Sequence, residues 1–359
     1  VRDGDVIIST VRTYLQAIAA IVNPQENLIV STGFAVVRPL SKFLDPRFCK
    51  YALREKHFLW EIETRSTGVS YPAINASELA DIRLCLPSIE TQRLIADYLD
   101  RETARIDALV ADKEKMLALL EEKRAALISR AVTRGLNPDA PLKPSGLDWL
   151  GDIPTHWEIR RCATLFQEID ERNCPGLPLL NVSLNTGVTL RVFSDSRIES
   201  VAADFASYKV ARKGDLVFNK MRFWQGAAGI APEDGLTSPD YTVARFSNEL
   251  NARFVEMLVR LPQFSNEVRR YSYGMVDDRL RLYWMEFRNL RIPIPPINEQ
   301  QAIVAKIESE SQSITELVSI LRQSISLAKE RRAALITAAV TGQIPIEEMQ
   351  AHLEQSHEN

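Results

Sequence analysis

Apolar side chains recur at steps near three, four and seven residues along two long, highly charged stretches of this chain. The first series consists of Ile95, Leu99, Ile106, Leu109, Met116, Leu120 and Leu127. The second consists of Ile303, Ile307, Ile314, Leu317, Leu321, Ile325, Ala328 and Leu335. Such spacing is the heptad pattern of a coiled-coil seam. It predicts two long helices, which we place at residues 87–135 and 294–342.

The two stretches are copies of each other. The sequence EKRAALISRAVT at residues 122–133 returns as ERRAALITAAVT at residues 330–341, and the alignment extends without a gap back to Pro87 and Pro295. A helix of this length spans roughly 65–70 Å at about 1.5 Å per residue and cannot bury its own seam. We therefore expect the two helices to pack antiparallel against each other.

Shorter, mixed patterns precede each long helix. Residues 1–86 contain strand-like runs followed by a helical stretch, and residues 147–293 form a larger part of the same kind. We call them the first and second globular parts. The turn sequence Asp3-Gly4-Asp5 in the first part matches Lys213-Gly214-Asp215 in the second, so the repeat extends into both. The pattern predicts an α+β chain, with small mixed sheets and helices in two globular parts, two long antiparallel helices and a pseudo-twofold internal repeat.

Three segments have a different composition or length. Residues 136–146 are rich in proline and are predicted to be a linker, while residues 343–359 form an acidic tail that we expect to be frayed beyond Pro345. About 65 residues separate the Trp149–Pro154 opening of the second part from Gly214, but few residues precede Gly4. We therefore expect the first globular part to be partial, with its front missing.

Composition and charge exclude few classes of protein. The chain has 359 residues, 45% hydrophobic and 25% charged, with a net charge of −3, the balance of an ordinary globular protein with room for two domains. No overall basic charge points to a polyanion, although a local patch would suffice to bind one. The sequence has no run of 18 apolar residues and no signal peptide, so we expect a cytoplasmic protein that does not cross a membrane.

Motifs for chemistry are absent from the sequence. The cysteines, Cys49, Cys85, Cys162 and Cys174, lack metal-ligand spacing and are expected to be free thiols. No phosphate-binding loop, nucleophile elbow or zinc-binding helix motif occurs, and the four histidines are scattered. We therefore expect no catalytic residue, no metal and no cofactor, and a role in binding.

Three features together point to one family. They are the duplicated plan, the Pro-Pro-Ile-Asn-Glu-Gln-Gln sequence at residues 295–301, and the Arg-Ala-Ala-Leu-Ile sequence near the end of each long helix. The chain resembles an N-terminally truncated specificity subunit of type I restriction-modification systems. Residues 150–158 are similar to the opening of that family's second target-recognition domain. Residues 86–92 are similar to the first copy of its Pro-Pro-x-x-Glu-Gln motif, with Thr91 in place of Glu.

The resemblance implies a function and partners. In this family each target-recognition domain reads half of a split DNA sequence, and the long helices hold the half-sites a fixed distance apart. They also dock two modification subunits, which methylate adenine, and restriction subunits complete an ATP-dependent endonuclease. The specificity subunit itself is not catalytic. The globular parts, 1–86 and 147–293, would then be a partial first and a complete second target-recognition domain.

Basic and aromatic residues mark the candidate DNA contacts. Arg and Gln side chains read guanine and adenine in the major groove, and Lys and Arg bind phosphate. In the second part the candidates are Lys209, Arg212, Lys213, Lys220, Arg222, Trp224, Gln225, Ser272, Tyr273 and Arg279. In the first part the matching positions are Thr10, Arg12, Tyr14, Ser70 and Tyr71.

Other interpretations stay open at this point. Each basic stretch could be a solvated turn, and the outer faces of the helices could be solvated or serve as docking surface. The main alternative is a coiled-coil scaffold that joins two protein-interaction modules and binds no DNA. A third is a chain that folds but does not read its first half-site.

Overall fold

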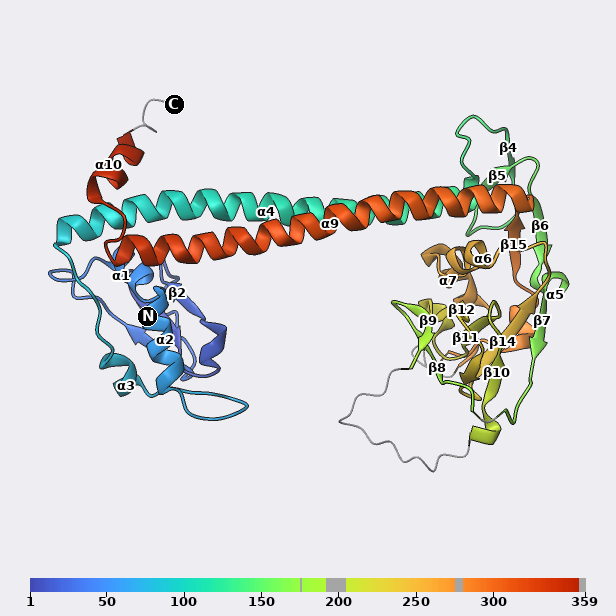
Figure 1. Ribbon diagram of the computed structural model, residues 1–359, viewed down its shortest axis with the longest axis horizontal. Coiled ribbons are helices and arrows are strands. Elements are labelled where there is room, and N and C mark those ends of the chain that lie inside the picture. The colour runs from blue at the N-terminus through green and yellow to red at the C-terminus, as the bar shows by residue number, and fades with distance from the viewer. Residues whose placement is uncertain (175, 192–204, 275–279, 355–359) are drawn as a thin grey trace. The chain divides into compact units, whose positions relative to one another are not determined.

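The computed structural model describes residues 1–174, 176–191, 205–274 and 280–354 of the chain (Figure 1). It divides into two compact units. Unit 1 comprises Val1–Leu119 and Leu317–Asn359, and unit 2 comprises Leu120–Glu316. Each unit therefore contains one globular part together with a segment of both long helices. Among the described residues, no helix combines the length and the apolar character needed to cross a membrane.

Two helices dominate the chain, α4 (Ile89–Arg134) and α9 (Ile297–Val340). In unit 1 the Arg332 guanidinium of α9 donates to Asp107 of α4 at 2.8 Å and 3.2 Å. One to two turns further along α4, Glu114 accepts from Lys329 at 3.2 Å. The partner number falls as the α4 number rises, so the helices run antiparallel in this unit.

In unit 2 the end of α4 packs with the beginning of α9. Val132 and Ile303 are fully buried in one core cluster with Ile307, so the antiparallel arrangement holds here too. The α+β class and the long antiparallel helices predicted from the sequence are therefore confirmed.

The seam differs in phase from the predicted one. Leu109, Met116 and Leu317 are exposed (49%, 51% and 49%), whereas Val110 is buried, and it packs with Leu117 in the helix–helix core. A straight helix has 3.6 residues per turn, so a strict seven-residue repeat drifts off the contact line. Buried apolar positions of the two helices include Ile95, Leu99, Ile106, Val110, Ile303, Ile307, Ile314, Val318, Ile325 and Ile336.

The first globular part is a three-stranded antiparallel sheet covered by short helices. Strand β1 lies between β2 and β3, and its alternating burial shows that one face of the sheet packs on the core. A 3-10 turn, η1, joins β1 to β2. Asp45 caps α1 by accepting from the backbone N–H groups of Arg47 and Phe48, a typical N-terminal signal. The elements are β1 (Val6–Ser9), η1 (Thr13–Leu15), β2 (Ile18–Ala20), β3 (Phe34–Val37), α1 (Pro46–Ala52), α2 (Lys56–Arg65) and α3 (Ala76–Ala80).

The acidic tail contains a helix, α10 (Ile346–Glu354). Its Met349 is 1% exposed and packs in a cluster with Tyr51, Tyr98 and Leu99. The expectation of a frayed tail is wrong for this segment, because apolar side chains at helical spacing find a partner surface in unit 1.

The second globular part is built around a four-stranded antiparallel sheet in the order β12-β11-β14-β7. In the described residues four two-stranded sheets accompany it, pairing β10 with β13, β15 with β6, β8 with β9 and β4 with β5. Strand β4 lies within residues 136–146, so the predicted linker contributes a strand to this pairing. The strands are β4 (Leu142–Pro144), β5 (Asp152–Pro154), β6 (Glu158–Arg161), β7 (Phe166–Ile169), β8 (Leu180–Ser183), β9 (Gly187–Leu190), β10 (Lys209–Ala211), β11 (Leu216–Asn219), β12 (Ala228–Ile230), β13 (Gly235–Thr237), β14 (Tyr241–Phe246) and β15 (Arg291–Ile294).

Short helices complete this part. They are α5 (Cys162–Leu165), η2 (Phe205–Ser207), η3 (Phe223–Gln225), α6 (Ala252–Val259), α7 (Pro262–Arg270) and α8 (Trp284–Phe287). The core is aromatic, with Trp157, Phe218, Phe223, Phe264 and Phe287 each fully buried. Phe218 and Phe223 stack at 4.6 Å between ring centroids, which fixes the start of η3 against β11.

Candidate nucleic-acid interface

A buried aspartate holds the framework of each globular part. Asp215 accepts from the backbone N–H of Arg212 at 2.9 Å and from the Arg245 guanidinium at 2.8 Å and 2.9 Å. Gly214 before it has φ +93°, a backbone conformation that residues other than glycine rarely adopt. The aspartate thus ties the turn before β11 to β14, the strand next to it.

Asp5 has the same partners in the first part. It accepts from the backbone N–H of Arg2 at 2.7 Å and from the Arg38 guanidinium at 2.8 Å and 2.7 Å. The hydrogen bonds from Arg38 lower the pKa of the Asp5 carboxyl below its usual value. The Gly-Asp repeat seen in the sequence therefore encodes the same salt bridge twice.

The η3 loop follows β11 and carries the strongest sequence candidates. Phe223 is fully buried and anchors the loop, while Arg222 and Gln225 on either side of it are exposed. Trp224 is half-buried, and its indole N–H donates to the Met221 carbonyl at 2.9 Å. The loop is thus anchored in the core by Phe223, and it exposes the guanidinium of Arg222 and the amide of Gln225 to solvent.

A second loop, which follows α7, meets the η3 loop. The Leu282 N–H donates to the Lys220 carbonyl at 2.9 Å, which joins the returning chain to the first loop. The Arg269 guanidinium at the end of α7 lies 5.3 Å from the centre of the Trp224 ring. Tyr273, beyond α7, is 62% exposed. Cations, an amide and aromatic rings therefore come from two loops that contact each other.

The first globular part brings the corresponding loops together. Arg12 caps η1 in the left-handed region (φ 54°), and its guanidinium lies 4.8 Å from the centre of the Tyr71 ring. The Thr13 and Ser66 hydroxyls are 2.8 Å apart, and the Ile74 N–H donates to the Thr10 carbonyl at 2.9 Å. The η1 loop and the loop after α2 are thus linked like their counterparts.

Several candidates from the sequence lie on these loops with exposed side chains. They are Arg222, Gln225, Tyr273, Arg12, Tyr14, Ser70 and Tyr71; Lys220, Trp224 and Thr10 are half-buried there. Lys213 is exposed, but on the turn before β11. Arg279 lies outside the described residues.

The structure does not support three other candidates as direct contacts. Lys209 is buried with its ammonium group 3.9 Å from Glu168 and 3.8 Å from Asp170, and burial lowers its pKa. Arg212 is engaged by two carboxylates, Glu171 and Asp234. Ser272 is 9% exposed and donates to the Val268 carbonyl at 2.7 Å. These side chains hold the framework, because each is buried or already bonded.

Sequence reasoning missed other side chains on the same surface. Arg281 is exposed opposite Tyr273, and Tyr283 is 44% exposed. In the first part Val69 is fully exposed at the tip of its loop and Leu15 is 59% exposed. Leu15 and Val69 are next to Tyr14 and Ser70, two candidates that the sequence did identify, and this was the signal for them.

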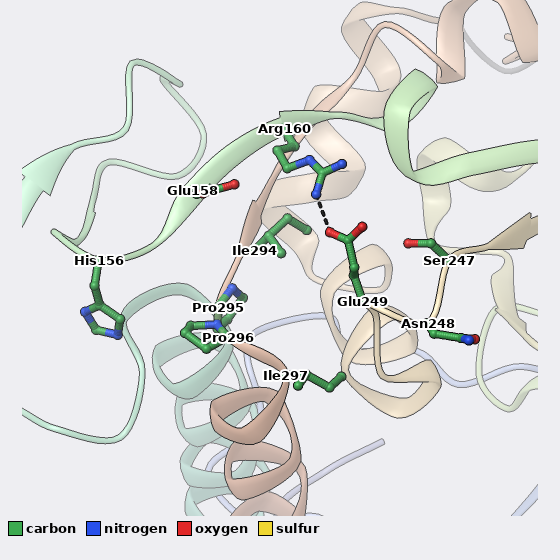
Figure 2. A pocket seen from close by; sticks show the side chains of 10 residues that line it. All are labelled: His156, Glu158, Arg160, Ser247, Asn248, Glu249, Ile294, Pro295, Pro296 and Ile297. Atoms are coloured by element: carbon green, nitrogen blue, oxygen red, sulfur yellow. Dashed lines mark hydrogen bonds and ion pairs between the residues drawn. The ribbon is translucent and has the colours of Figure 1, made fainter.

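The two sequence motifs that suggested a family meet at the start of α9. Glu299 accepts from the Trp157 indole at 3.1 Å, and its carboxylate lies 2.7 Å from the His156 ring. Beside them is a hollow of about 550 Å³, in which Figure 2 shows an ion pair between Arg160 and Glu249. The motifs are therefore packing partners, and Thr91 takes the place of Glu299 in the first copy.

Comparison with known proteins gives one consistent result. Residues 2–117 match the family model of the type I restriction modification DNA specificity domain. The MjaVIII specificity subunit of Methanocaldococcus jannaschii, a type I restriction enzyme, is 21% identical over 89% of this chain and 75% of its own length. The EcoBI specificity subunit of Escherichia coli is 23% identical over 84% and 69% of the two chains.

Two solved structures share the fold. A chain from a study of complex assembly and conformational transition in the type I R-M system has a TM-score of 0.70 at 22% identity, covering 95% of this chain and 82% of that one. The HsdS subunit from Thermoanaerobacter tengcongensis has a TM-score of 0.53 at 22% identity, covering 96% and 82%.

Proposed function

We propose that this chain, a non-catalytic relative of the specificity subunits of type I restriction-modification systems, reads a bipartite DNA target through the paired loops of its globular parts. Within that proposal the η3 loop and the loop after α7 read one half-site. The η1 loop and the loop after α2 read the other.

The observation that carries the proposal is the repeated convergence of two loops. In each part an exposed arginine stands on the 3-10 turn, at Arg222 and Arg12, and a cation contacts an aromatic ring across the loops. Arginine reads guanine with two hydrogen bonds and glutamine reads adenine, so Arg222 and Gln225 are the proposed base contacts of the second part.

We propose modification and restriction subunits as further partners. The relatives named as specificity subunits support this, and so do the charged, solvent-exposed faces of α4 and α9. The proposed complex methylates adenine and cleaves DNA in the cytoplasm with catalytic residues supplied by those partners.

Methylation of a randomised DNA pool in the presence of modification subunits tests the proposal. We expect a split, adenine-methylated motif, and we expect the double change Arg222→Ala and Gln225→Ala to relax only one half of it. Arg291→Ala, an exposed arginine on β15, is the matched control. Methylation without any sequence preference would contradict the proposal.

The scaffold alternative gives a different result in a simpler assay. A protein that contacts phosphates releases counterions when it binds DNA. Its affinity for random duplex DNA therefore falls as salt is added, with a slope of about −0.9 per phosphate contact in a plot of log affinity against log salt concentration. A protein that only joins two protein-binding modules would show no measurable affinity at low salt.

A further inference from the structure

A buried glutamine connects the second globular part to the first turn of its long helix. Gln300 is 0% exposed, and its side-chain oxygen accepts from the Asn251 N–H at 2.8 Å. Its side-chain nitrogen donates to the Glu249 carbonyl and to the Pro295 carbonyl, each at 2.9 Å. One amide therefore joins the end of the β14–α6 connection to the junction between β15 and α9.

Gln92 makes the same three bonds in the first part. It is 1% exposed, accepts from the Asp45 N–H at 2.9 Å, and donates to the Phe43 carbonyl at 3.0 Å and the Pro87 carbonyl at 2.9 Å. The two glutamines occupy equivalent positions of the repeat. The same bonds in two copies of different surrounding sequence indicate a requirement of the architecture.

The bonds of Gln300 lie where strand β15 ends and helix α9 begins, at two consecutive prolines. Pro295 and Pro296 have no N–H to donate, so the backbone there cannot form a continuous ladder between strand and helix. From the first turn of α9, the Gln300 side chain supplies donors to the Pro295 carbonyl and to the Glu249 carbonyl. A buried amide with all its partners in place has one orientation, since any other leaves polar groups unsatisfied.

The residues bonded to each glutamine are connected through short helices to the proposed recognition loops. Asn251 is the N-cap of α6, and α6 is followed after two residues by α7, which ends at the second loop. Asp45 is likewise the N-cap of α1, which precedes α2 and its loop. Each glutamine thus fixes the helix pair that carries a loop against the beginning of a long helix.

We propose that Gln300 and Gln92 are positioning residues that set the orientation of each recognition surface on its long helix, and thereby the spacer length that the chain accepts between half-sites. This proposal rests on the proposed function. Neither glutamine contacts DNA in it. They determine which spacing brings both loop pairs onto their bases.

The test uses the full chain with modification subunits and a set of duplexes that differ only in spacer length. Gln300→Met removes the three bonds and keeps a similar volume. We expect it to reduce the preference for the cognate spacer over spacers one base pair longer or shorter by roughly tenfold, the effect of leaving buried partners unsatisfied. Affinity for a duplex with only the second half-site is expected to stay within about twofold, because the loops themselves are unchanged.

Gln301→Met is the matched control, since Gln301 is the exposed neighbour on the same turn. If Gln300→Met does not fold, as judged by circular dichroism, Gln92→Met tests the same expectation in the other copy. An unchanged spacer profile overturns the proposal, and so does a uniform loss of methylation at every spacer, which indicates a merely structural role. Failure of the proposed function is distinct, because the unmodified chain would then show no sequence preference at all.

Discussion

The two globular parts share the hydrogen bonds that hold their turns and strands together, but their exposed loops differ. Asp5 and Asp215 close equivalent turns onto Arg38 and Arg245, and equivalent strands pair in the order β2-β1-β3 and β12-β11-β14. The contact between the loops is reversed. In the first part the cation is on the 3-10 turn and the ring on the loop after α2, whereas in the second the ring is on η3 and the cation at the end of α7.

This reversal distinguishes contacts that the fold requires from contacts that belong to the proposed recognition loops. Bonds that define the turn and the helix junction recur atom for atom, because the backbone geometry demands them. The loop contact recurs only as a type of interaction, so its residues are free to change identity. We therefore expect changes in the shared bonds to affect stability, and changes in the loops to affect binding.

The largest expected effect is on stability, from removing the buried aspartates. Asp215→Asn leaves Arg245 without its carboxylate and should lower the free energy of unfolding by about 2–4 kcal/mol, and Asp5→Asn should do the same in the first part. Cys162 and Cys49 are buried reporters of the two parts, and burial raises the pKa of the Cys49 thiol to about 12, so labelling requires unfolding. We expect each variant to lower the urea concentration at which its own reporter becomes reactive.

Asp240→Asn changes an exposed aspartate of the second part and should leave both labelling midpoints in place. If Asp5→Asn shifted the Cys162 midpoint more than the Cys49 midpoint, the two salt bridges would not be equivalent.

The second effect is on DNA binding. Arg222→Ala and Arg12→Ala should each cost about 1–3 kcal/mol of cognate affinity and relax specificity at a base position in a different half-site. Arg291→Ala and Arg83→Ala, both exposed, are controls for the two parts. Equal weakening on all sequences would identify phosphate contacts in place of base contacts, and no change in either variant would favour solvated turns.

Much of the framework could be predicted from the sequence, because it depends on local patterns. The long helices follow from their apolar period, and the Gly-Asp turns from glycine at positive φ. The seam phase could not be predicted, since Leu109 and Val110 are adjacent apolar residues and only the partner helix selects Val110.

The site was predictable by location more than by residue. The basic stretch around η3 was identified, but the sequence does not show which side of β10 is covered, so Lys209 was mistaken for a surface residue. The contact of Arg269 with Trp224 joins two distant segments and has no local pattern. The Arg12–Tyr71 contact depends in the same way on two loops that only the fold brings together.

A smaller effect should follow from the reversed loop contact. Tyr71→Leu removes the ring under Arg12, and Trp224→Leu removes the ring under Arg269. Each should weaken DNA binding by about 0.5–1 kcal/mol, the strength of an exposed cation–π contact. Tyr71→Phe keeps the ring and should bind like the unchanged protein in the same fluorescence anisotropy titration. A loss as large for Tyr71→Phe would mean that the hydroxyl, not the ring, contacts the DNA.

The last expected effect concerns acid. Because the hydrogen bonds from Arg38 hold the pKa of the Asp5 carboxyl below its usual value in the folded state, they stabilise the first part at pH values above the unfolded-state pKa. That stabilisation is lost as the pH falls through the folded-state pKa, where the carboxylate becomes protonated in both states. The difference in Cys49 labelling midpoint between the unchanged protein and Asp5→Asn should therefore be constant above about pH 5 and shrink below about pH 4, as measured with a disulfide reagent that works in acid. A difference that stayed constant down to pH 2 would show that Asp5 stabilises the turn through shape and packing alone, with no contribution from its charge.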